Sequence, residues 1–339
     1  VMNRIQKYAL EETRLGIPVL FCGEALAGGL FYGATYFPTA IGLASTWEPE
    51  LIAEMCRIVQ TQMFEYGVRL VYSPVLDIAR DPRWGRIGET YGEDPYLASQ
   101  LGKAFVKAMQ GNDLTRGVAC TGKHFLGYAA GEGGINKGAV SIGQRELYEI
   151  YARPFEAVIR DSEVKAIMNS YCVIDNVPVA SSKEILTNLL KKKLGFKGVV
   201  FSDSAAIEQL VTRNRSAGNF EEAAIRAITA GIDIAISEPP VYLFLKDAVE
   251  SGKINETVID ESVKKVLKLK FELGLFENPY APGEVNKVVY TVQNNIQAYK
   301  TAVKSLVLLK NDGKLLPLAK DKASIAVIGP NADCIRCFF

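Results

Sequence analysis

Short apolar runs alternate regularly with longer helical patterns along most of this chain. The runs predicted as strands are Pro18 to Cys22, Leu70 to Ser73, Val118 to Thr121, Lys165 to Asn169, Val199 to Ser202 and Ile232 to Ile236. The helical patterns between them are Pro49 to Tyr66, Pro95 to Gln110, Ile142 to Arg160, Ser182 to Lys193 and Glu221 to Ala230. This alternation predicts a parallel sheet, and its many repeats predict a TIM-like (β/α)8 barrel. A closed barrel needs eight strands, so we expect either weak further strands or a barrel that is incomplete at the N-terminus.

The pattern changes at a proline-rich segment that starts with Phe276. Pro279 and Pro282 interrupt any regular structure there, so we place the domain boundary at this point. The expected division is a barrel domain over 1–278, a linker over 279–300 and the start of a second α/β domain over 301–339. Just before the boundary, Ile254 to Leu275 is predicted to form two helices.

Beyond the boundary, the sequence predicts a helix near Asn294 to Ser305, followed by apolar runs at Leu306 to Leu309 and Ser324 to Gly329. The second run is typical of the first central strand of an α/β sheet. A central strand without neighbours leaves its backbone groups unpaired. We therefore expect the sequence to be a fragment that stops early in the second domain.

Charge and cysteine content exclude several classes of protein. Lys plus Arg number 39 and Asp plus Glu number 38, so nucleic acid is not an expected partner. No apolar run is long enough to cross a membrane, and the first residues predict a polar helix and not a secretion signal. Cys334 and Cys337 form a lone CxxC pair without a second pair of ligands, and His124 is the only histidine. A metal site is therefore not expected, and localisation stays open.

An acidic residue follows the most apolar of the predicted strands. Val199 to Phe201 is wholly apolar, and Ser202 and Asp203 come directly after it. In a β/α barrel the carboxyl ends of the strands carry the chemistry, so Asp203 is a candidate catalytic residue. The alternative is that Asp203 caps a helix over 205–210. The local sequence alone does not decide between the two.

Basic residues lie at two other strand ends. Lys123 and His124 follow the run at 118–121 and are candidates for hydrogen bonding to substrate hydroxyls. Arg83 and Arg86 belong to the irregular segment DPRWGR. We expect one of these arginines to brace the loop by pairing with a nearby carboxylate and the other to bind a ligand.

An acidic residue and an apolar pair complete the set of candidates. Glu24 follows the first predicted strand, and Met168 and Tyr171 follow the fourth. Acids, donors and an apolar surface together suit a small neutral polyhydroxylated ligand such as a sugar. The glycine-rich loop after His124 lacks the spacing of a dinucleotide site, so phosphate binding is not favoured.

Many segments of the chain match one family in order. These segments are GIPVLFCGEALAGG, GATYFP, SPVLDIARDPRWGR, ETYGEDPYL, KHFLGY, RELYE, PFEAVI, MNSY, GFKGVVFSD, AGIDI, LGLFENPY, LVLLKN, LLPL and IAVIGPNAD. With them the chain resembles glycoside hydrolase family 3, the group of β-glucosidases and β-xylosidases. The resemblance implies a β/α barrel followed by an α/β sandwich, with a sugar pocket at the carboxyl ends of the barrel strands.

The resemblance also implies a role for each candidate residue. Asp203 matches the catalytic nucleophile. The expected substrate-binding residues are Glu24, Arg86, Lys123, His124, Met168 and Tyr171. The implied activity is retaining hydrolysis of terminal non-reducing β-D-glucosyl or xylosyl residues through a glycosyl–aspartate ester, with no cofactor and no metal.

Some positions depart from the family pattern. Ser204 stands where an aromatic residue commonly flanks the leaving-group subsite, Ala27 replaces a common histidine, and Tyr128 occupies the position of the acid/base histidine of one branch. The resemblance places the general acid/base glutamate beyond Phe339, in a C-terminal domain that we expect to complete the site. A sugar-binding remnant without turnover, and a metal- or phosphate-dependent barrel enzyme, stay open as alternatives.

Overall fold

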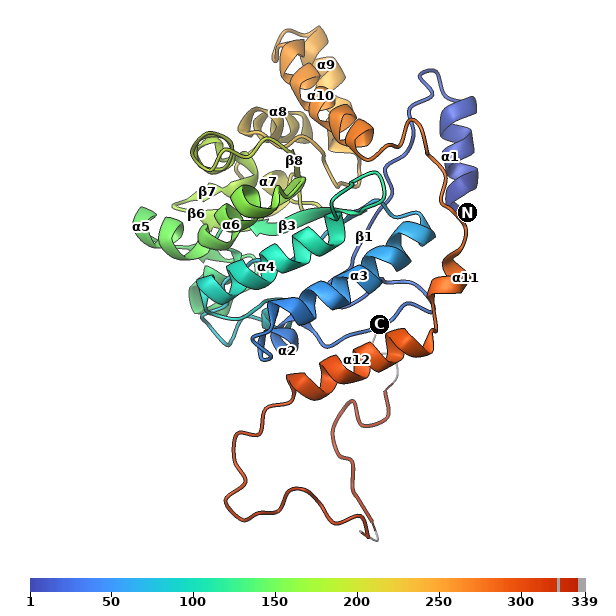
Figure 1. Ribbon diagram of the computed structural model, residues 1–339. Helices are drawn as coiled ribbons and strands as arrows, with labels where there is room; N and C mark the ends of the chain where they lie inside the picture. Colours follow the sequence, from blue (N-terminus) through green and yellow to red (C-terminus); the bar gives the residue numbers. More distant parts are fainter. Residues whose placement is uncertain (322–323, 335–339) are drawn as a thin grey trace.

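A parallel sheet lies at the centre of the computed structural model, which describes residues 1–321 and 324–334 (Figure 1). Its order is β1-β2-β3-β5-β8. The strands are β1 (Cys22–Gly23), β2 (Leu70–Val71), β3 (Ala119–Phe125), β5 (Ala166–Asn169) and β8 (Val199–Phe201). A parallel bridge from Phe201 to Ile234 adds the sixth predicted run. The predicted strands thus lie side by side in chain order, as in a TIM-like barrel, and within the described residues the sheet stays open.

The two faces of the sheet pack against different parts of the chain, because successive strand residues point to opposite sides. One face carries Leu70, Ala119, Ala166, Met168, Val199 and Phe201, which form a cluster with Leu269, Leu273 and Leu275. The other face carries Val71, Cys120, Ile167 and Val200, which belong to the larger core beneath the helices. Every residue of β3 is buried, as expected for a strand covered on both sides.

The helices that cover the larger core follow the predicted ranges closely. α3 (Pro49–Tyr66) and α4 (Pro95–Gln110) have the predicted bounds and pack side by side (Figure 1). Each begins with a proline, whose missing N–H costs nothing in the first turn. Asp94 caps α4 by accepting a hydrogen bond from the Leu97 amide at 2.6 Å.

The predicted helix over 142–160 is divided in the structure. It consists of α5 (Gln144–Glu146), the π-helical turn η4 (Leu147–Tyr151) and α6 (Arg153–Ser162). Pro154 lacks an amide hydrogen, which ends the regular pattern of hydrogen bonds at this point. Leu147, Tyr151 and Phe155 are nevertheless buried on one face, as their spacing predicts.

The remaining elements are short or lie outside the main sheet. The helices are α1 (Met2–Glu11), α2 (Ala40–Ala44), α7 (Gln209–Thr212), α8 (Phe220–Ala230), α9 (Leu245–Glu250), α10 (Glu256–Glu272), α11 (Val285–Val288), α12 (Val292–Ser305) and the π-helical η6 (Glu184–Lys193). The 3-10 turns are η1 (Ile87–Glu89), η2 (Tyr128–Ala130), η3 (Glu132–Gly134), η5 (Val179–Ser181) and η7 (Val241–Phe244). A small second sheet contains β4 (Ala139–Val140), β6 (Val173–Ile174) and β7 (Val177–Pro178). In the part of the chain that the structure describes, no helix is long and apolar enough to span a bilayer.

The prediction of two helices over 254–275 is wrong. A single helix, α10, runs from Glu256 to Glu272, because no residue inside this range interrupts the backbone hydrogen bonding. Asn255 accepts from the Thr257 amide at 2.9 Å at its start, and Gly274 follows its end with a positive φ of +67°. The apolar side of α10 meets the sheet through Leu269.

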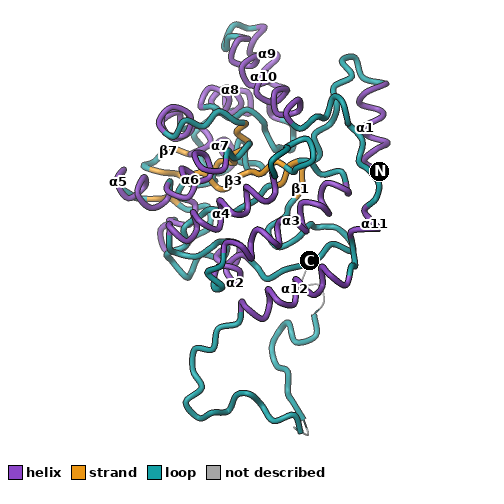
Figure 2. Tube along the Cα trace, in the orientation of Figure 1, coloured by secondary structure: helices purple, strands orange, loops and turns teal. Residues whose placement is uncertain are grey.

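The helix predicted near Asn294 to Ser305 forms as α12, which crosses the boundary between the predicted linker and the predicted second domain. α12 packs on α2 and α3, and Ser45 Oγ donates to the Ser305 carbonyl at 2.9 Å. The run 324–329, predicted as a strand, and the apolar run 306–309 form no strand in the structure (Figure 2), and both are exposed. No described segment pairs with them, and an unpaired strand gains no ladder hydrogen bonds. Cys337 of the CxxC pair lies outside the described residues, and the domain division at 300/301 stays a prediction.

A buried carboxylate joins the outer side of the sheet to two helices. Asp233 accepts from the Val200 amide at 2.9 Å, Ser262 Oγ at 3.0 Å and Lys265 Nζ at 2.8 Å. Ser262 and Lys265 bind Oδ1 of Asp233, whereas the Val200 amide binds Oδ2, and Lys191 Nζ lies 3.6 Å from Oδ2. Each oxygen of this carboxylate therefore has at least two partners, as a buried charge requires.

We expect Asp233→Ala to lower the free energy of unfolding by about 2–4 kcal/mol, because it leaves a buried amide and two lysines without their acceptor. Urea denaturation followed by circular dichroism measures the change. Asp247→Ala on α9, where the side chain is exposed, serves as control and should change stability by less than about 0.5 kcal/mol. Equal effects of the two substitutions would show that the Asp233 cluster does not stabilise the fold.

Candidate active site

Four of the predicted site residues meet at the carboxyl end of the sheet. Glu24 follows β1, Lys123 and His124 lie within β3, and Asp203 follows β8. Because these strands are parallel, their carboxyl ends share one edge. Lys123 Nζ lies 2.7 Å from Glu24 Oε1, and His124 Nε2 lies 3.5 Å from Asp203 Oδ2. Residues up to 179 positions apart in the sequence thus form one cluster.

The carboxylate of Asp203 is held by one oxygen only. The residue is 9 % exposed, and its Oδ1 accepts from the Ser204 amide at 2.7 Å. Its own amide donates to Asn169 Oδ1 at 3.3 Å. Its Oδ2 is buried and has no hydrogen-bond partner among the described atoms. The alternative that Asp203 caps a helix over 205–210 is wrong, because the next helix, α7, begins only at Gln209.

His124 is buried between an acid and an arginine. Its Nδ1 lies 2.7 Å from Asp77 Oδ2, and its Nε2 lies 3.2 Å from Arg86 Nη2. Because a guanidinium only donates, Nε2 must accept, and the ring proton is therefore on Nδ1 and donated to Asp77. The His124 amide also donates to Asp77 Oδ2, at 3.1 Å. Burial lowers the pKa of His124 to about 3, so the ring is neutral near pH 7.

Arg86 is braced and also placed in the site. Its guanidinium forms a bidentate ion pair with Glu89, with hydrogen bonds of 2.6 and 2.8 Å, and its Nη1 donates to Tyr128 Oη at 3.4 Å. The expected bracing is made by Arg86 and Glu89, and the binding of a ligand by either arginine stays a prediction. Arg83 pairs with Asp81 in an exposed position, whereas Arg86 does the bracing and also contacts His124.

Lys123 and Glu24 form a second ion pair in the cluster, separate from the pair of Arg86 and Glu89. The Lys123 side chain is buried. Glu24 Oε1 accepts from it, while Glu24 Oε2 is buried without a partner among the described atoms. Burial raises the pKa of Glu24, and the Lys123 ammonium opposes this shift. Glu24 Oε2 and Asp203 Oδ2 are thus two buried acceptors left open within one site.

The predicted pair Met168 and Tyr171 is separated by the structure. Met168 is buried in the apolar cluster beside Phe201, so its contact with a ligand stays a prediction. The Tyr171 hydroxyl donates to the Ser204 carbonyl at 2.7 Å, and its ring centroid lies 5.6 Å from that of Tyr128. Tyr171 therefore lies against the backbone that carries Asp203.

Sequence reasoning gave no role in the site to Asp77, Tyr128 and Asn169, each of which contacts a predicted site residue. Glu89, the partner of Arg86, is one of the nearby carboxylates expected to brace an arginine. A signal existed for Asp77, because it is an acidic residue directly after the apolar pair Val75 and Leu76. Asn169 likewise ends β5, next to Ser170.

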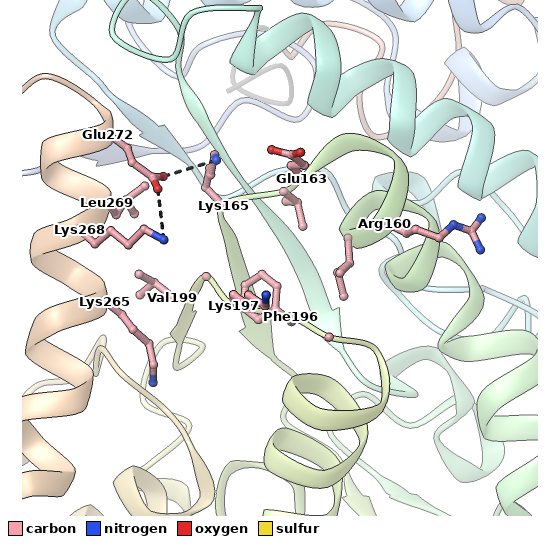
Figure 3. Close-up of a pocket in the computed structure, with 14 residues that line it drawn as sticks. Arg160, Glu163, Lys165, Phe196, Lys197, Val199, Lys265, Lys268, Leu269 and Glu272 are labelled. Atoms are coloured by element: carbon pink, nitrogen blue, oxygen red, sulfur yellow. Dashed lines mark ion pairs between the residues drawn. The ribbon is translucent and has the colours of Figure 1, made fainter.

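A cavity of about 380 Å³ opens at the other end of the sheet. Its lining includes Lys165, which precedes β5, and Val199, which begins β8, so it lies at the amino ends of the strands. Glu272 stands between Lys165 and Lys268 at 3.4 and 3.6 Å (Figure 3). In β/α barrels this end contributes to stability, whereas the carboxyl ends carry the chemistry.

Comparison with known families shows that most of this chain matches a glycosidase domain. The glycosyl hydrolase family 3 N-terminal domain matches residues 1–269. A putative β-xylosidase of Formosa agariphila is 38 % identical over 334 residues, which are 97 % of this chain and 44 % of that protein. A periplasmic β-glucosidase of Salmonella typhimurium is 33 % identical, over 99 % of this chain and 44 % of that protein.

The solved structures that this chain resembles include β-glucosidases. A β-glucosidase from Erythrobacter marinus superposes with a TM-score of 0.91 at 33 % identity, covering 94 % of this chain and 43 % of that one. A β-glucosidase from Listeria innocua in complex with glucose superposes with a TM-score of 0.87 at 35 % identity, covering 94 % and 44 %. This chain therefore spans less than half the length of these relatives.

The single histidine allows a direct test of its protonation. Because burial lowers the pKa of His124 to about 3, only about 1 % of the ring should be protonated at pH 5. We expect ¹⁵N NMR of the tag-free chain to show a neutral ring with its proton on Nδ1 from pH 8 to pH 5. The urea-unfolded chain is the control and should titrate near pH 6.5. A folded-state midpoint between pH 5.5 and 7.5 would contradict the assigned hydrogen bonds.

Proposed function

Because the chain belongs to glycosyl hydrolase family 3, we propose that it carries the sugar-binding and nucleophile-bearing part of a retaining β-glycosidase. The substrates are terminal non-reducing β-D-glucosyl or xylosyl units. The observation that carries the proposal is the Asp203 carboxylate, which is buried and fixed through Oδ1, while its Oδ2 has no hydrogen-bond partner among the described atoms. The names of the relatives, β-glucosidases and β-xylosidases, support this substrate class.

In the first step, Asp203 Oδ2 attacks the anomeric carbon of the sugar. A bond forms between this oxygen and the carbon, while the glycosidic bond breaks and its electrons stay on the leaving oxygen. In the second step, water attacks the anomeric carbon of the ester and releases Asp203. A second carboxylic acid protonates the leaving oxygen and then activates the water. We propose that this acid lies outside the present sequence, in a C-terminal domain that completes the site, as the family resemblance implies.

The neighbours of Asp203 suit binding and orientation. The neutral His124 has its Nδ1 proton on Asp77 and its Nε2 facing Arg86, so it has no free proton to give to a leaving group. Its Nε2 instead lies 3.2 Å from Arg86 Nη2 and 3.5 Å from Asp203 Oδ2. On the other side, Lys123 offers its remaining ammonium hydrogens and Glu24 offers Oε2, a donor and an acceptor for adjacent sugar hydroxyls.

We expect Asp203 to be labelled by 2,4-dinitrophenyl 2-deoxy-2-fluoro-β-D-glucoside or its xyloside analogue. The leaving group needs no proton, so the missing acid does not prevent the first step. Mass spectrometry of peptides should locate one adduct at Asp203. Asp203→Asn should abolish it while circular dichroism stays unchanged, and Asp175→Asn at an exposed turn should retain it.

An adduct on another residue would remove Asp203 from the role of nucleophile. Binding of glucose or xylose without any adduct would support the alternative of a sugar-binding protein without turnover.

We expect Glu24→Gln to weaken the binding of isofagomine about 10- to 100-fold, because an ionised acceptor in the site is replaced by a neutral amide. Isothermal titration calorimetry measures the dissociation constant. Glu163→Gln, at the amino end of β5, is the matched control and should bind as the unsubstituted chain does (Figure 3). Unchanged affinity in Glu24→Gln would exclude Glu24 from ligand binding.

A further inference from the structure

A further cation, in addition to Lys123 and Arg86, lies at the rim of the site, on a loop that none of the proposed steps uses. Lys137 belongs to the segment between η3 and β4, and its Nζ lies 3.9 Å from the ring centroid of Tyr171. Its carbonyl accepts from Arg213 Nη2 at 3.3 Å, which ties this loop to the end of α7. Two positively charged residues from different parts of the chain are therefore neighbours, and the ammonium group of one of them, Lys137, lies over the Tyr171 ring.

The charge of Lys137 has no acidic partner. No carboxylate of the described residues lies within ion-pair distance of its Nζ or of the Arg213 guanidinium, whereas Arg86 and Lys123 each have one. Lys137 is partly buried against an aromatic ring. Such burial removes water from the ammonium, and a cation–π contact replaces only part of the lost hydration. The arrangement therefore favours an anion that comes from outside the chain.

Lys137 also lies within electrostatic reach of the proposed nucleophile. Burial lowers the pKa of Lys137, and the Asp203 carboxylate opposes this shift. Tyr171, which Lys137 covers, donates to the carbonyl of Ser204, the residue next to Asp203. A bound substrate at Asp203 thus passes close to Lys137.

The order of the strands indicates which part of the substrate lies near Lys137. Glu24 and Lys123 belong to the β1–β3 side of the sheet, whereas Tyr171 and Ser204 follow β5 and β8. The anomeric carbon and the outer hydroxyls lie at opposite ends of a pyranose ring. With the outer hydroxyls at Glu24 and the anomeric carbon at Asp203, the released unit extends away from Glu24, toward Tyr171 and Lys137.

We propose that Lys137, with Arg213 beside it, binds an anionic substituent, a carboxylate or a sulfate, on the unit that the enzyme releases. The inference rests on the proposed function, because the positions of Asp203 and Glu24 orient the substrate. It narrows the substrate class to β-glucosides or β-xylosides of acidic or sulfated sugars.

The test uses thioglycosides, which bind without being hydrolysed. Dissociation constants of 4-carboxyphenyl and 4-carbamoylphenyl 1-thio-β-D-glucoside and the corresponding xylosides are measured by calorimetry at low salt. The two aglycones have nearly the same shape and differ in charge. A second pair, 4-sulfophenyl and 4-sulfamoylphenyl, represents the sulfate. The pair with the larger preference for the charged ligand distinguishes carboxylate from sulfate.

We expect the chain to bind the charged ligand about 3- to 10-fold more tightly than its neutral partner. Lys137→Gln should reduce this ratio to about one, and Lys137→Arg, which retains the charge, should keep most of it. Lys197→Gln, at the exposed rim of the cavity at the other end of the sheet, is the control and should leave the ratio unchanged (Figure 3). The ratio should fall as salt is raised.

A ratio near one in the unsubstituted chain, or the same ratio in Lys137→Gln, would overturn the inference. Labelling of Asp203 together with such a result would leave the proposed function intact. A charge preference that depends on Lys137, without any adduct at Asp203, would support the anion site and count against the hydrolase. Absence of binding by every ligand would overturn both.

Discussion

The buried imidazole of His124 connects the parts of the candidate site, because its two nitrogens contact different elements. Nδ1 donates to Asp77, while Nε2 lies 3.2 Å from Arg86 Nη2 and 3.5 Å from Asp203 Oδ2. Arg86 is in turn fixed by Glu89. Without a neutral ring at this position, Arg86 would face no acceptor there, and the loop of Arg86 would lose its link to β3. The contact between the Arg86 guanidinium and β3 therefore depends on the protonation of one side chain.

The chain treats its buried carboxylates in two different ways. Asp233, on the outer side of the sheet, is surrounded by an amide, a hydroxyl and two ammonium groups. Asp203 and Glu24, at the carboxyl ends of the strands, each keep one buried oxygen without a partner in the described structure. Buried polar atoms without partners are costly, and native structures contain few of them. Glu65 and Glu208 also have one such oxygen, so it is the open oxygen together with the location at the strand ends that separates Asp203 and Glu24 from Asp233.

Much of the fold follows from local patterns. The apolar runs predict the strands, and the spacing of apolar residues with an initial proline predicts α3 and α4 to the residue. The errors arise where local pattern is ambiguous. α10 is one helix because no residue breaks it, and the last apolar runs stay extended and exposed because no described strand pairs with them. Strand formation depends on neighbours, whereas a helix satisfies its own hydrogen bonds.

For the site, the amino-acid sequence alone determined which residue types stand at the strand ends, because parallel strands bring their carboxyl ends to one edge. That is why Asp203, Glu24, Lys123 and His124 could be selected without coordinates. Only the tertiary structure decided that Arg86 pairs with Glu89 and also contacts His124, that Met168 lies in the apolar core, and that Asp77 fixes the tautomer of His124. It also decided that Lys137 faces Tyr171 without an acidic partner among the described residues. These outcomes depend on distances between side chains from remote segments, and spacing along the chain contains no information about such distances.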